Sequence, residues 1–387
     1  MSVNSLPLEP IAPQKYSSRA EMLGHEVSSL HDFFNNNSAK NFTGSSRKSF
    51  HPDDPTPLKG MFVLVGIPDE RGVLANGGHP GAAQGPESFR AAFYKFYDTV
   101  LREFCPRTHR PCAPTHQRAT SESALLSSVF LDAGNIILMP TVAETHVCLA
   151  QVVEWLLQKG ACLVTVVGGG HDFAYGSYAG HVAACKGIVP IVNLDAHFDL
   201  RPVVDGVINS GTAFSRIIHD YPANVVGGRA LLELGLQRER NPQSLYDFAL
   251  AHNVASVEYL PILDVWRNMA DARETSPVEH LLDHLDGCRH WGWNRELGSV
   301  HLSLCLDVFS AWAAPGTSAS TPFGAPVESL GPVLSFLGRT RFCKVLDVAE
   351  LCPPRDVGDQ TARLAASLVY KFALLREEYS APENLSE

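Results

Sequence analysis

From Met61 onward, short apolar runs alternate along the chain with longer stretches in which apolar residues recur at helical spacing. Nearly continuous apolar strands between amphipathic helices are typical of a parallel sheet covered on both faces. The pattern therefore predicts an α/β fold. The strand-like runs include MFVLVGIP (61–68), CLVTVVGGG (162–170), IVPIVNLDA (188–196) and HLSLCLDVF (301–309), and the helix-like ones include residues 86–104, 142–160 and 361–379.

Residues 1–58 show a different pattern. They contain NNNSAKNFTGSSRKSFHPDDPTP, a stretch rich in Asn, Ser and Pro with few large apolar side chains, which cannot offset its own ordering entropy. We expect a flexible N-terminal extension over residues 1–58, one domain over residues 59–380 and a short tail over residues 381–387. Neither an internal repeat nor a linker interrupts the alternating pattern.

Composition narrows the class of function. The 387 residues carry a formal net charge of −10, and the 31 Lys and Arg residues form no basic stripe, which argues against nucleic acid or an anionic membrane as partner. The chain has no apolar run of about 18 residues, and its polar start lacks the features of a signal peptide. Nine scattered cysteines predict a reducing, cytoplasmic location. We expect a small-molecule substrate and leave assembly into a homo-oligomer open.

The ends of three predicted strands are unusually polar. Ligands of open parallel sheets bind beyond the carboxyl ends of the strands, so these residues are the first candidates for chemistry. VTVVGGG is followed by His171, IVNL by DAHFD (195–199), and LSL by Cys305 and Asp307.

The DAHFD segment is the most informative of the three. If strand geometry continues through it, Asp195, His197 and Asp199 share one face, because successive side chains alternate sides. Two carboxylates and an imidazole on one face are costly to bury unless a cation compensates them. These donors suit Mn, Fe, Zn or Co, and more than one Asp favours Mn.

Each motif alone also has a simpler interpretation. Three glycines before a helix more often form a tight or phosphate-binding turn, and a single histidine such as His171 is more often a hydrogen-bonded structural residue. A solvated acidic loop explains two of the DAHFD residues but not their alternation beside an apolar strand. The combination therefore favours a metal site.

The order of these motifs resembles that of the ureohydrolases, the family that includes arginase, agmatinase and formimidoylglutamase. The resemblance covers Met61 to about Leu374 and is closest to the formimidoylglutamase branch. It rests on NGGHPGAAQGPESFR, GGGHDFAYGSYAG, NLDAHFD, SGTAF, LDVFSAWAAPGTSA and LDVAEL.

The resemblance implies an arginase-like, three-layer α/β/α fold with a mostly parallel central sheet. It also implies a hydrolase with two Mn²⁺ ions and a hydroxide between them, acting on a linear amidine. Within the branch, N-formimino-L-glutamate and water give L-glutamate and formamide in histidine catabolism. Two alternatives stay open: an agmatinase-like hydrolase, and a catalytically impaired relative. Phe214 stands where arginase has a proton-shuttling His, which argues against arginase.

By position, the resemblance assigns His171 to the first metal, His197 and Asp307 to the second, and Asp195 to a bridge between them. Asp199 would bind the first metal and hydrogen-bond the hydroxide, and it would carry the proton that the departing amine needs. Glu350 would face the amidinium group of the substrate; its simpler interpretation is an ordinary acid at a strand end.

Cys305 departs from the family pattern, because the family has a second bridging Asp at this position. A thiolate is a soft ligand that favours Zn or Fe over Mn. Zn²⁺ or incomplete occupancy is therefore an alternative to two Mn²⁺ ions. Cys305 could also be only a small buried residue.

Candidate substrate contacts follow from the remaining motifs. Asn76 belongs to the Gly-rich segment, in which His79 replaces an Arg that formimidoylglutamases commonly have. Ser210 and Thr212 would supply hydroxyl groups, and Arg216 would pair with a substrate carboxylate. A surface position on a helix is the alternative for Arg216.

Overall fold

The computed structural model describes residues 5–12, 15, 28–30, 56–96, 130–258, 277–294 and 299–378. Their strands form a ten-stranded sheet in the order β1-β4-β3-β5-β10-β9-β6-β7-β8, and β2 pairs with β4 outside this path. The β1–β4 pair is antiparallel and the other pairs are parallel, which confirms the predicted mostly parallel sheet. The strands are β1 (Leu8–Glu9), β2 (Ser28–Ser29), β3 (Phe62–Ile67), β4 (Phe130–Ile136), β5 (Leu163–Gly168), β6 (Ile191–Leu194), β7 (Leu231–Leu236), β8 (Ala255–Glu258), β9 (Val300–Cys305) and β10 (Cys343–Ala349).

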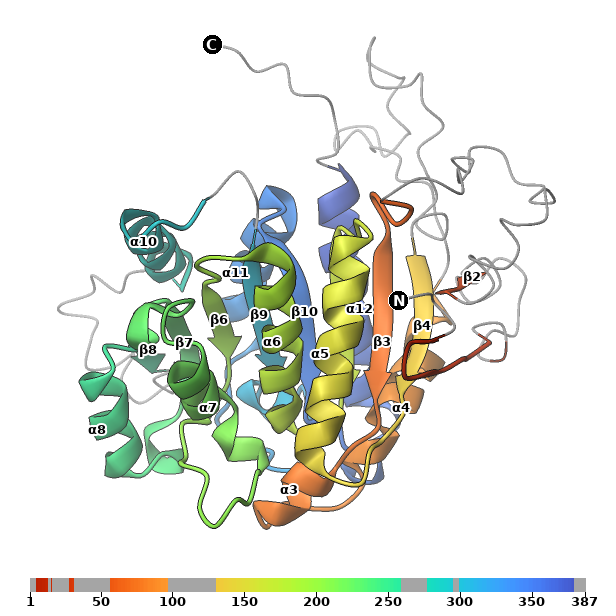
Figure 1. Cartoon of the computed structure of the whole chain (residues 1–387). Coiled ribbons are helices and arrows are strands. Elements are labelled where there is room, and N and C mark those ends of the chain that lie inside the picture. The colour runs from red at the N-terminus through yellow and green to blue at the C-terminus, as the bar shows by residue number, and fades with distance from the viewer. Residues whose placement is uncertain are drawn as a thin grey trace, which may run out of the picture.

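Helices cover both faces of this sheet, which confirms the three-layer α/β/α fold (Figure 1). One layer contains α5 (Val142–Gln158), α6 (Ala174–Cys185) and α7 (Ala213–Asp220). The opposite layer contains α4 (Gly85–Phe93), α10 (Pro277–His290), α11 (Val327–Thr340) and α12 (Gln360–Glu378). The short helix α3 (Arg71–Ala75) and α8 (Gln243–Ala251) complete the described helices of the α type.

Local sequence explains where the helices begin and end. Helix α5 begins at a capping box: Glu144 N–H donates to Thr141 Oγ1, and Thr141 N–H donates to the Glu144 carboxylate. Helix α12 agrees with the predicted stretch 361–379. Helix α4 ends at Phe93, whereas its pattern continues to residue 104; residues 97–104 lie outside the described part of the chain.

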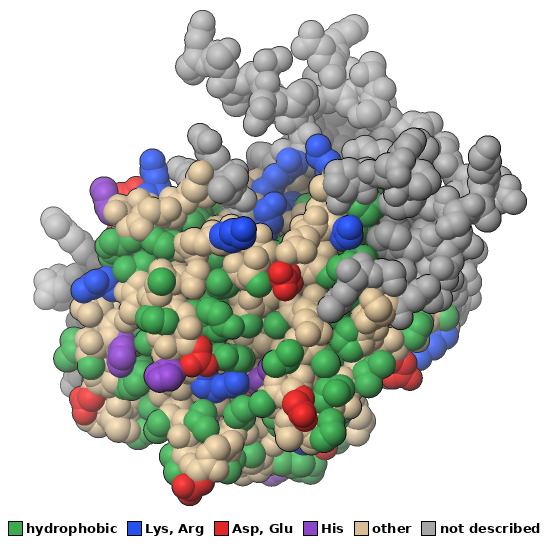
Figure 2. Space-filling view, viewed as in Figure 1, with side chains coloured by type: hydrophobic (Ala, Val, Ile, Leu, Met, Phe, Trp, Pro, Cys, Tyr) green, Lys and Arg blue, Asp and Glu red, His purple; other side chains and the backbone are tan. Residues whose placement is uncertain are grey.

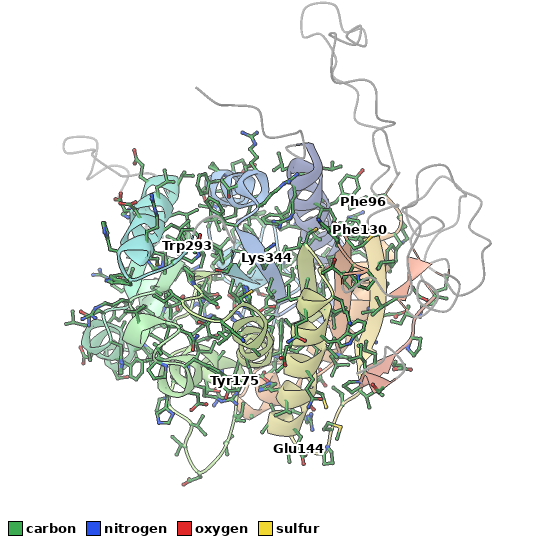
Figure 3. All side chains as sticks on the ribbon, turned by 45° about the horizontal axis from the view of Figure 1, so that its top comes forward. Phe96, Phe130, Glu144, Tyr175, Trp293 and Lys344 are labelled. Carbon is green, nitrogen blue, oxygen red and sulfur yellow. The ribbon has the colours of Figure 1, made fainter. Side chains whose placement is uncertain are left out.

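Both faces of the sheet are buried, as the near-continuous apolar runs predict. In β3, Phe62 packs in the core beneath α4 and α12, whereas Val63 packs in the core beneath α5. Aromatic side chains fill the first core: the ring centroids of Phe93 and Phe130 lie 5.2 Å apart, and Phe96 lies close by (Figure 3). Each strand therefore presents apolar side chains to two helical layers.

Parts of the N-terminal segment dock on the edge of the sheet. Strands β1 and β2 both pair with β4, and Leu6 and Leu30 are buried in the same core as Leu131. Most of residues 1–58 and all of residues 381–387 lie outside the described residues. The predicted boundaries at residues 58 and 380 therefore stay predictions.

A helix that crosses a membrane must be both long and apolar. None of the helices in the described ranges is both long and apolar enough to cross a bilayer. Helix α12, with 19 residues, carries Lys371 and Arg376.

On the face of the molecule over α5, α6 and α7, charged side chains lie among apolar and neutral ones (Figure 2).

Candidate metal centre

The four adjacent strands β5, β10, β9 and β6 position the polar motifs. All four run parallel, so their carboxyl ends lie at one edge of the sheet. His171 follows β5, Asp195 follows β6 and Glu350 follows β10, while Cys305 is the last residue of β9. The topology therefore brings together residues that are far apart in sequence.

The glycine run after β5 allows His171 to enter this edge. A Cβ atom on Gly168 would lie 2.1 Å from the Phe173 ring, and one on Gly169 would lie 2.0 Å from the Asp69 carbonyl oxygen. Only glycine fits such close approaches. The turn leaves His171 buried, with its backbone N–H donating to Glu350 Oε1 at 3.0 Å and its Nε2 atom 2.7 Å from Ser303 Oγ.

Strand geometry does not continue through DAHFD, because β6 ends at Leu194, so the condition for sharing a strand face is not met. A turn brings these side chains together instead. His197 N–H donates to Asp195 Oδ1 at 2.7 Å, and Asp199 adopts a left-handed backbone with φ of 49°. Asp tolerates this conformation better than most residues, because its short polar side chain bonds locally. The three side chains converge through the turn and not through strand alternation.

The resulting cluster has Asp195 at its centre. His171 Nδ1 lies 2.9 Å from Asp195 Oδ2 and 2.8 Å from Asp199 Oδ2. His197 Nδ1 lies 3.4 Å from Asp195 Oδ1 and 3.2 Å from Asp307 Oδ2. Two sets of three donor atoms, each within 4.8 Å of one another, share Asp195: His171 with Cys305, and His197 with Asp307. The structure thus brings all six predicted ligand side chains together.

Electrostatics show that this cluster holds more negative charge than it can bury alone. Burial and the neighbouring Asp195 raise the pKa of Asp199 to about 6, and the same two causes raise the pKa of Asp307. Burial lowers the pKa of His171, but the carboxylates of Asp195 and Asp199 outweigh it, so the net pKa is well above the usual value. Protons therefore compensate the carboxylates in the absence of a cation.

The donor set fits a divalent cation. The buried His171 Nδ1 and Asp195 Oδ2 atoms lie 2.9 Å apart, close enough for an ion pair, but neither has a contact with hydrogen-bond geometry among the described residues. Buried polar atoms are normally satisfied, and unsatisfied ones mark an ion or a catalytic role. Imidazole and carboxylate donors converging from two sides match the preferences of first-row divalent metals. A cation between them would take the place of the compensating protons.

Glu350 is held beside the cluster by its backbone. Its φ of 68° is left-handed, which is uncommon for Glu and is a form of strain often found at functional sites. Its N–H donates to the Gly169 carbonyl at 2.8 Å, and Ser318 Oγ donates to its carboxylate. Burial raises the pKa of Glu350 to about 8, and the carboxylate of Asp307 adds to this effect.

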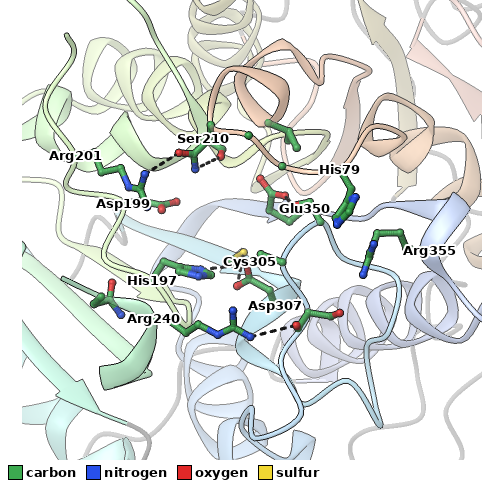
Figure 4. Close-up of a pocket in the computed structure, with 18 of the residues that line it drawn as sticks. His79, His197, Asp199, Arg201, Ser210, Arg240, Cys305, Asp307, Glu350 and Arg355 are labelled. Carbon is green, nitrogen blue, oxygen red and sulfur yellow. Dashed lines mark hydrogen bonds and ion pairs between the residues drawn. The ribbon is translucent and has the colours of Figure 1, made fainter.

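A pocket of about 410 Å³ opens onto the cluster (Figure 4). Its lining includes Asp199, Asp307, Glu350 and Cys305, together with three arginines: Arg201, Arg240 and Arg355. Each arginine donates to a neutral acceptor, namely Asn76 Oδ1, the Ser320 carbonyl and the Thr317 carbonyl, respectively. Within the described ranges, none of the three forms an ion pair with a carboxylate. Three guanidinium groups are therefore available to an anionic ligand.

The predicted substrate contacts differ in where the structure places them. Asn76 and Ser210 line the pocket, and Asn76 Nδ2 donates to Ser210 Oγ at 2.9 Å. Thr212 does not line it: its hydroxyl donates to the Asn209 carbonyl at 2.7 Å. His79, at the position of the missing Arg, lies at the pocket beside Arg355 (Figure 4).

Arg216 lies outside the pocket. Its guanidinium group is 3.6 Å from the ring centroid of Tyr175 on α6, a side chain labelled in Figure 3, and one of its nitrogen atoms is 3.1 Å from His146 Nδ1. Arg216 lies in the first half of α7, and the buried face of this helix carries Phe214 and Ile217. The cation–π contact explains this position, because a guanidinium stacks well on an aromatic face.

Sequence reasoning missed the three pocket arginines, although a signal was present. Arg201 follows DAHFD by two residues, Arg240 follows β7 and Arg355 follows β10. The strand-end rule that identified the acidic residues would also have indicated these positions.

Comparison with known protein families identifies the family to which the chain belongs. A sequence model of the arginase family matches residues 61–375. This chain belongs to the arginase family. The resemblance inferred from the motifs is thereby confirmed, and the arginase-family match spans strands β3 to β10, helices of both layers and the whole acidic cluster.

Within the arginase family, the chain is similar to proteins named formimidoylglutamase. Formimidoylglutamase from Rhodococcus jostii is 32% identical over 326 residues, which cover 82% of this chain and 86% of that protein. Formimidoylglutamase from Ralstonia nicotianae is 30% identical over 324 residues, with the same shares.

Solved structures show the same fold. Formiminoglutamase from Trypanosoma cruzi with Mn²⁺ has a TM-score of 0.65 at 22% identity, covering 86% of this chain and 98% of that one. Formimidoylglutamase from Bacillus subtilis has a TM-score of 0.64 at 20% identity, covering 90% and 99%. The arginase-like fold is therefore shown independently of the sequence match.

Proposed function

We propose that this protein is a metal-dependent hydrolase of a linear amidine and that its substrate is N-formimino-L-glutamate. Water would convert this substrate to L-glutamate and formamide, a step of histidine catabolism. The relatives named formimidoylglutamase support the reaction class. The observation that carries the choice of substrate is the polarity of the pocket, whose lining combines the acidic cluster with three arginines.

This polarity matches the charges of the substrate. N-formimino-L-glutamate has a cationic amidinium group at one end and two carboxylates beyond it, so the acidic cluster and the arginines each meet an opposite charge. Arg201, Arg240 and Arg355 are suited to carboxylates because a guanidinium donates two parallel N–H bonds. Agmatine carries a second cation where these arginines lie, which would be repelled. The pocket therefore favours formiminoglutamate over agmatine.

The proposed cofactor is a pair of divalent ions, Mn²⁺ by analogy with the Trypanosoma cruzi relative. His171 and Asp199 would hold the first ion, His197 and Asp307 the second, and Asp195 both. When bound, such a pair lowers the pKa of a shared water so that hydroxide is present near neutral pH.

The protein's own side chains supply the remaining chemistry. Addition of water forms a C–O bond at the amidine carbon, and the bond from this carbon to the glutamate nitrogen then breaks as that nitrogen gains a proton. Asp199 lines the pocket and lies 2.8 Å from His171 Nδ1, a position from which it can carry that proton. The buried Glu350 carboxylate would accept hydrogen bonds from the amidinium and fix its orientation.

A substrate panel tests the proposal. With Mn²⁺ added, the protein is expected to hydrolyse N-formimino-L-glutamate at least about 100-fold faster, in kcat/KM, than agmatine or L-arginine, because two unmatched charge contacts cost roughly 3 kcal/mol. Formamide release is the measurement. Preferred turnover of agmatine would support the agmatinase alternative, and turnover of none of the three would support the catalytically impaired one.

Removal of a single pocket arginine is expected to weaken substrate binding. Arg355→Ala or Arg240→Ala should raise KM for N-formimino-L-glutamate by about 10- to 100-fold with little change in kcat, since a charge-assisted hydrogen bond contributes about 1.5–3 kcal/mol. Arg229→Ala, at an exposed position outside the pocket, is the matched control. An unchanged KM in both pocket variants would contradict the assigned carboxylate contacts.

The cytoplasmic location and the assembly state are not addressed by the pocket. The location stays a prediction from the sequence, and assembly into a homo-oligomer stays open.

A further inference from the structure

Cys305 takes part in the acidic cluster and not only in the core. Cys305 is 1% exposed, is the last residue of β9 and lines the pocket. Its Sγ atom, His171 and Asp195 offer donor atoms that all lie within 4.8 Å of one another. The in-register neighbour on β10 is the small Ala349, which leaves the thiol the space at the strand end.

The two halves of the cluster consequently differ in chemistry. The half around His197 and Asp307 offers nitrogen and oxygen donors, whereas the half around His171 offers nitrogen, oxygen and sulfur. Hard oxygen donors suit Mn²⁺, and a thiolate with an imidazole suits Zn²⁺. The six side chains of the cluster therefore provide two half-sites, one of which suits Mn²⁺ and the other Zn²⁺.

From this asymmetry we infer that Cys305 is a ligand of the first metal position and makes that position selective for Zn²⁺ over Mn²⁺. The inference rests on the metal centre of the proposed function. On binding, a sulfur–metal bond forms, the S–H bond breaks and the proton passes to solvent.

The alternative is that Cys305 only donates its S–H group to Asp307 Oδ1, 2.9 Å away. That bond satisfies the thiol, but it contributes nothing to the buried His171 Nδ1 and Asp195 Oδ2 atoms, which lie 2.9 Å apart without hydrogen-bond geometry between them. Both atoms belong to the side chains that share the half-site with Cys305. A cation at this position satisfies all three groups at once, which a thiol hydrogen bond does not.

Cobalt titration of the full-length protein tests the inference, because Co²⁺ occupies Zn²⁺ sites and absorbs according to its ligands. The wild-type protein should show both visible cobalt bands and a near-ultraviolet thiolate-to-cobalt charge-transfer band. Cys305→Ser and Cys305→Asp should lose the charge-transfer band. Cys288→Ser should keep it: Cys288 is a buried thiol 3.7 Å from His284 Nε2 but outside the pocket, and so controls for cobalt bound elsewhere.

Competition between metals supplies a readout that is independent of activity. Wild-type protein and Cys305→Asp are dialysed against equal concentrations of Zn²⁺ and Mn²⁺. The ratio of bound Zn²⁺ to bound Mn²⁺ should be lower in Cys305→Asp by about 10-fold or more. Loss of a residue that only hydrogen-bonds to a metal ligand already changes metal affinity by about this factor. An unchanged ratio would overturn the inference.

The outcomes separate this inference from the proposed function. Visible cobalt bands without charge transfer in the wild-type protein would leave the metal centre in place and reject Cys305 as a ligand. Charge transfer that survives Cys305→Ser but not Cys288→Ser would reject it as well. A wild-type protein that binds no cobalt would overturn both the inference and the proposed function.

Discussion

Asp195→Ala is expected to lower turnover of N-formimino-L-glutamate by about 10³-fold or more while the protein remains folded. Asp195 belongs to both halves of the cluster, so its removal weakens both proposed metal positions. Lewis-acid stabilisation is worth several kcal/mol, and about 1.4 kcal/mol corresponds to a tenfold change in rate. Steady-state kinetics with added Mn²⁺, together with bound metal per chain, measure the effect.

The fold should survive this change because Asp195 lies beyond the end of β6 and pairs with His171 and His197 of the cluster rather than with the apolar core. Thermal unfolding monitors this directly. Asp283→Ala, at an exposed position of α10, is the control and should leave turnover and metal content unchanged. Full turnover by a folded Asp195→Ala protein would disprove the dinuclear centre.

Glu350→Gln is expected to reduce kcat/KM for the same substrate by about 10² to 10⁴-fold. The change keeps the shape of the side chain but removes the carboxylate, which a bound amidinium would keep ionised by lowering its raised pKa. Two charge-assisted hydrogen bonds of about 1.5–3 kcal/mol each account for this range. Kinetics at saturating Mn²⁺ measure the loss.

Metal content distinguishes this role from that of a metal ligand. Glu350 receives a hydrogen bond from His171 N–H and lies in neither half of the cluster, so Glu350→Gln should bind metal like the wild-type protein. Glu328→Gln, exposed on α11, provides the control for loss of one carboxylate. If Glu350→Gln retained normal kcat/KM, the amidinium would be held by other groups.

The sequence by itself determined the architecture and the acidic part of the site. Runs such as LVTVV and IVNL are apolar at all but one position, a pattern typical of strands buried on both faces, so the parallel sheet followed from local composition. Parallel strands place their carboxyl ends at one edge. Polar residues directly after three strands therefore had to meet there, whatever the details of their turns.

Tertiary structure decided how these side chains meet. Asp195, His197 and Asp199 converge through a turn with a left-handed Asp199, which strand alternation did not predict. A turn of this kind depends on long-range contacts, such as the Phe214 N–H donating to the Asp199 carbonyl at 3.1 Å. The direction of the Cys305 thiol likewise became clear only from its neighbours on adjacent strands.

Tertiary structure also decided which basic residues could recognise a substrate. Arg216 was expected at the pocket but stacks on Tyr175, whereas Arg201, Arg240 and Arg355 meet there from three separate loops. A long side chain reaches whatever charge or aromatic face lies within its range, and that neighbour is set by packing rather than by its place in the chain. Strand ends, and the basic residues near them, could be read from the sequence because apolar runs are local. Which of these basic side chains reach the pocket could not, because that depends on distances between segments far apart in the chain.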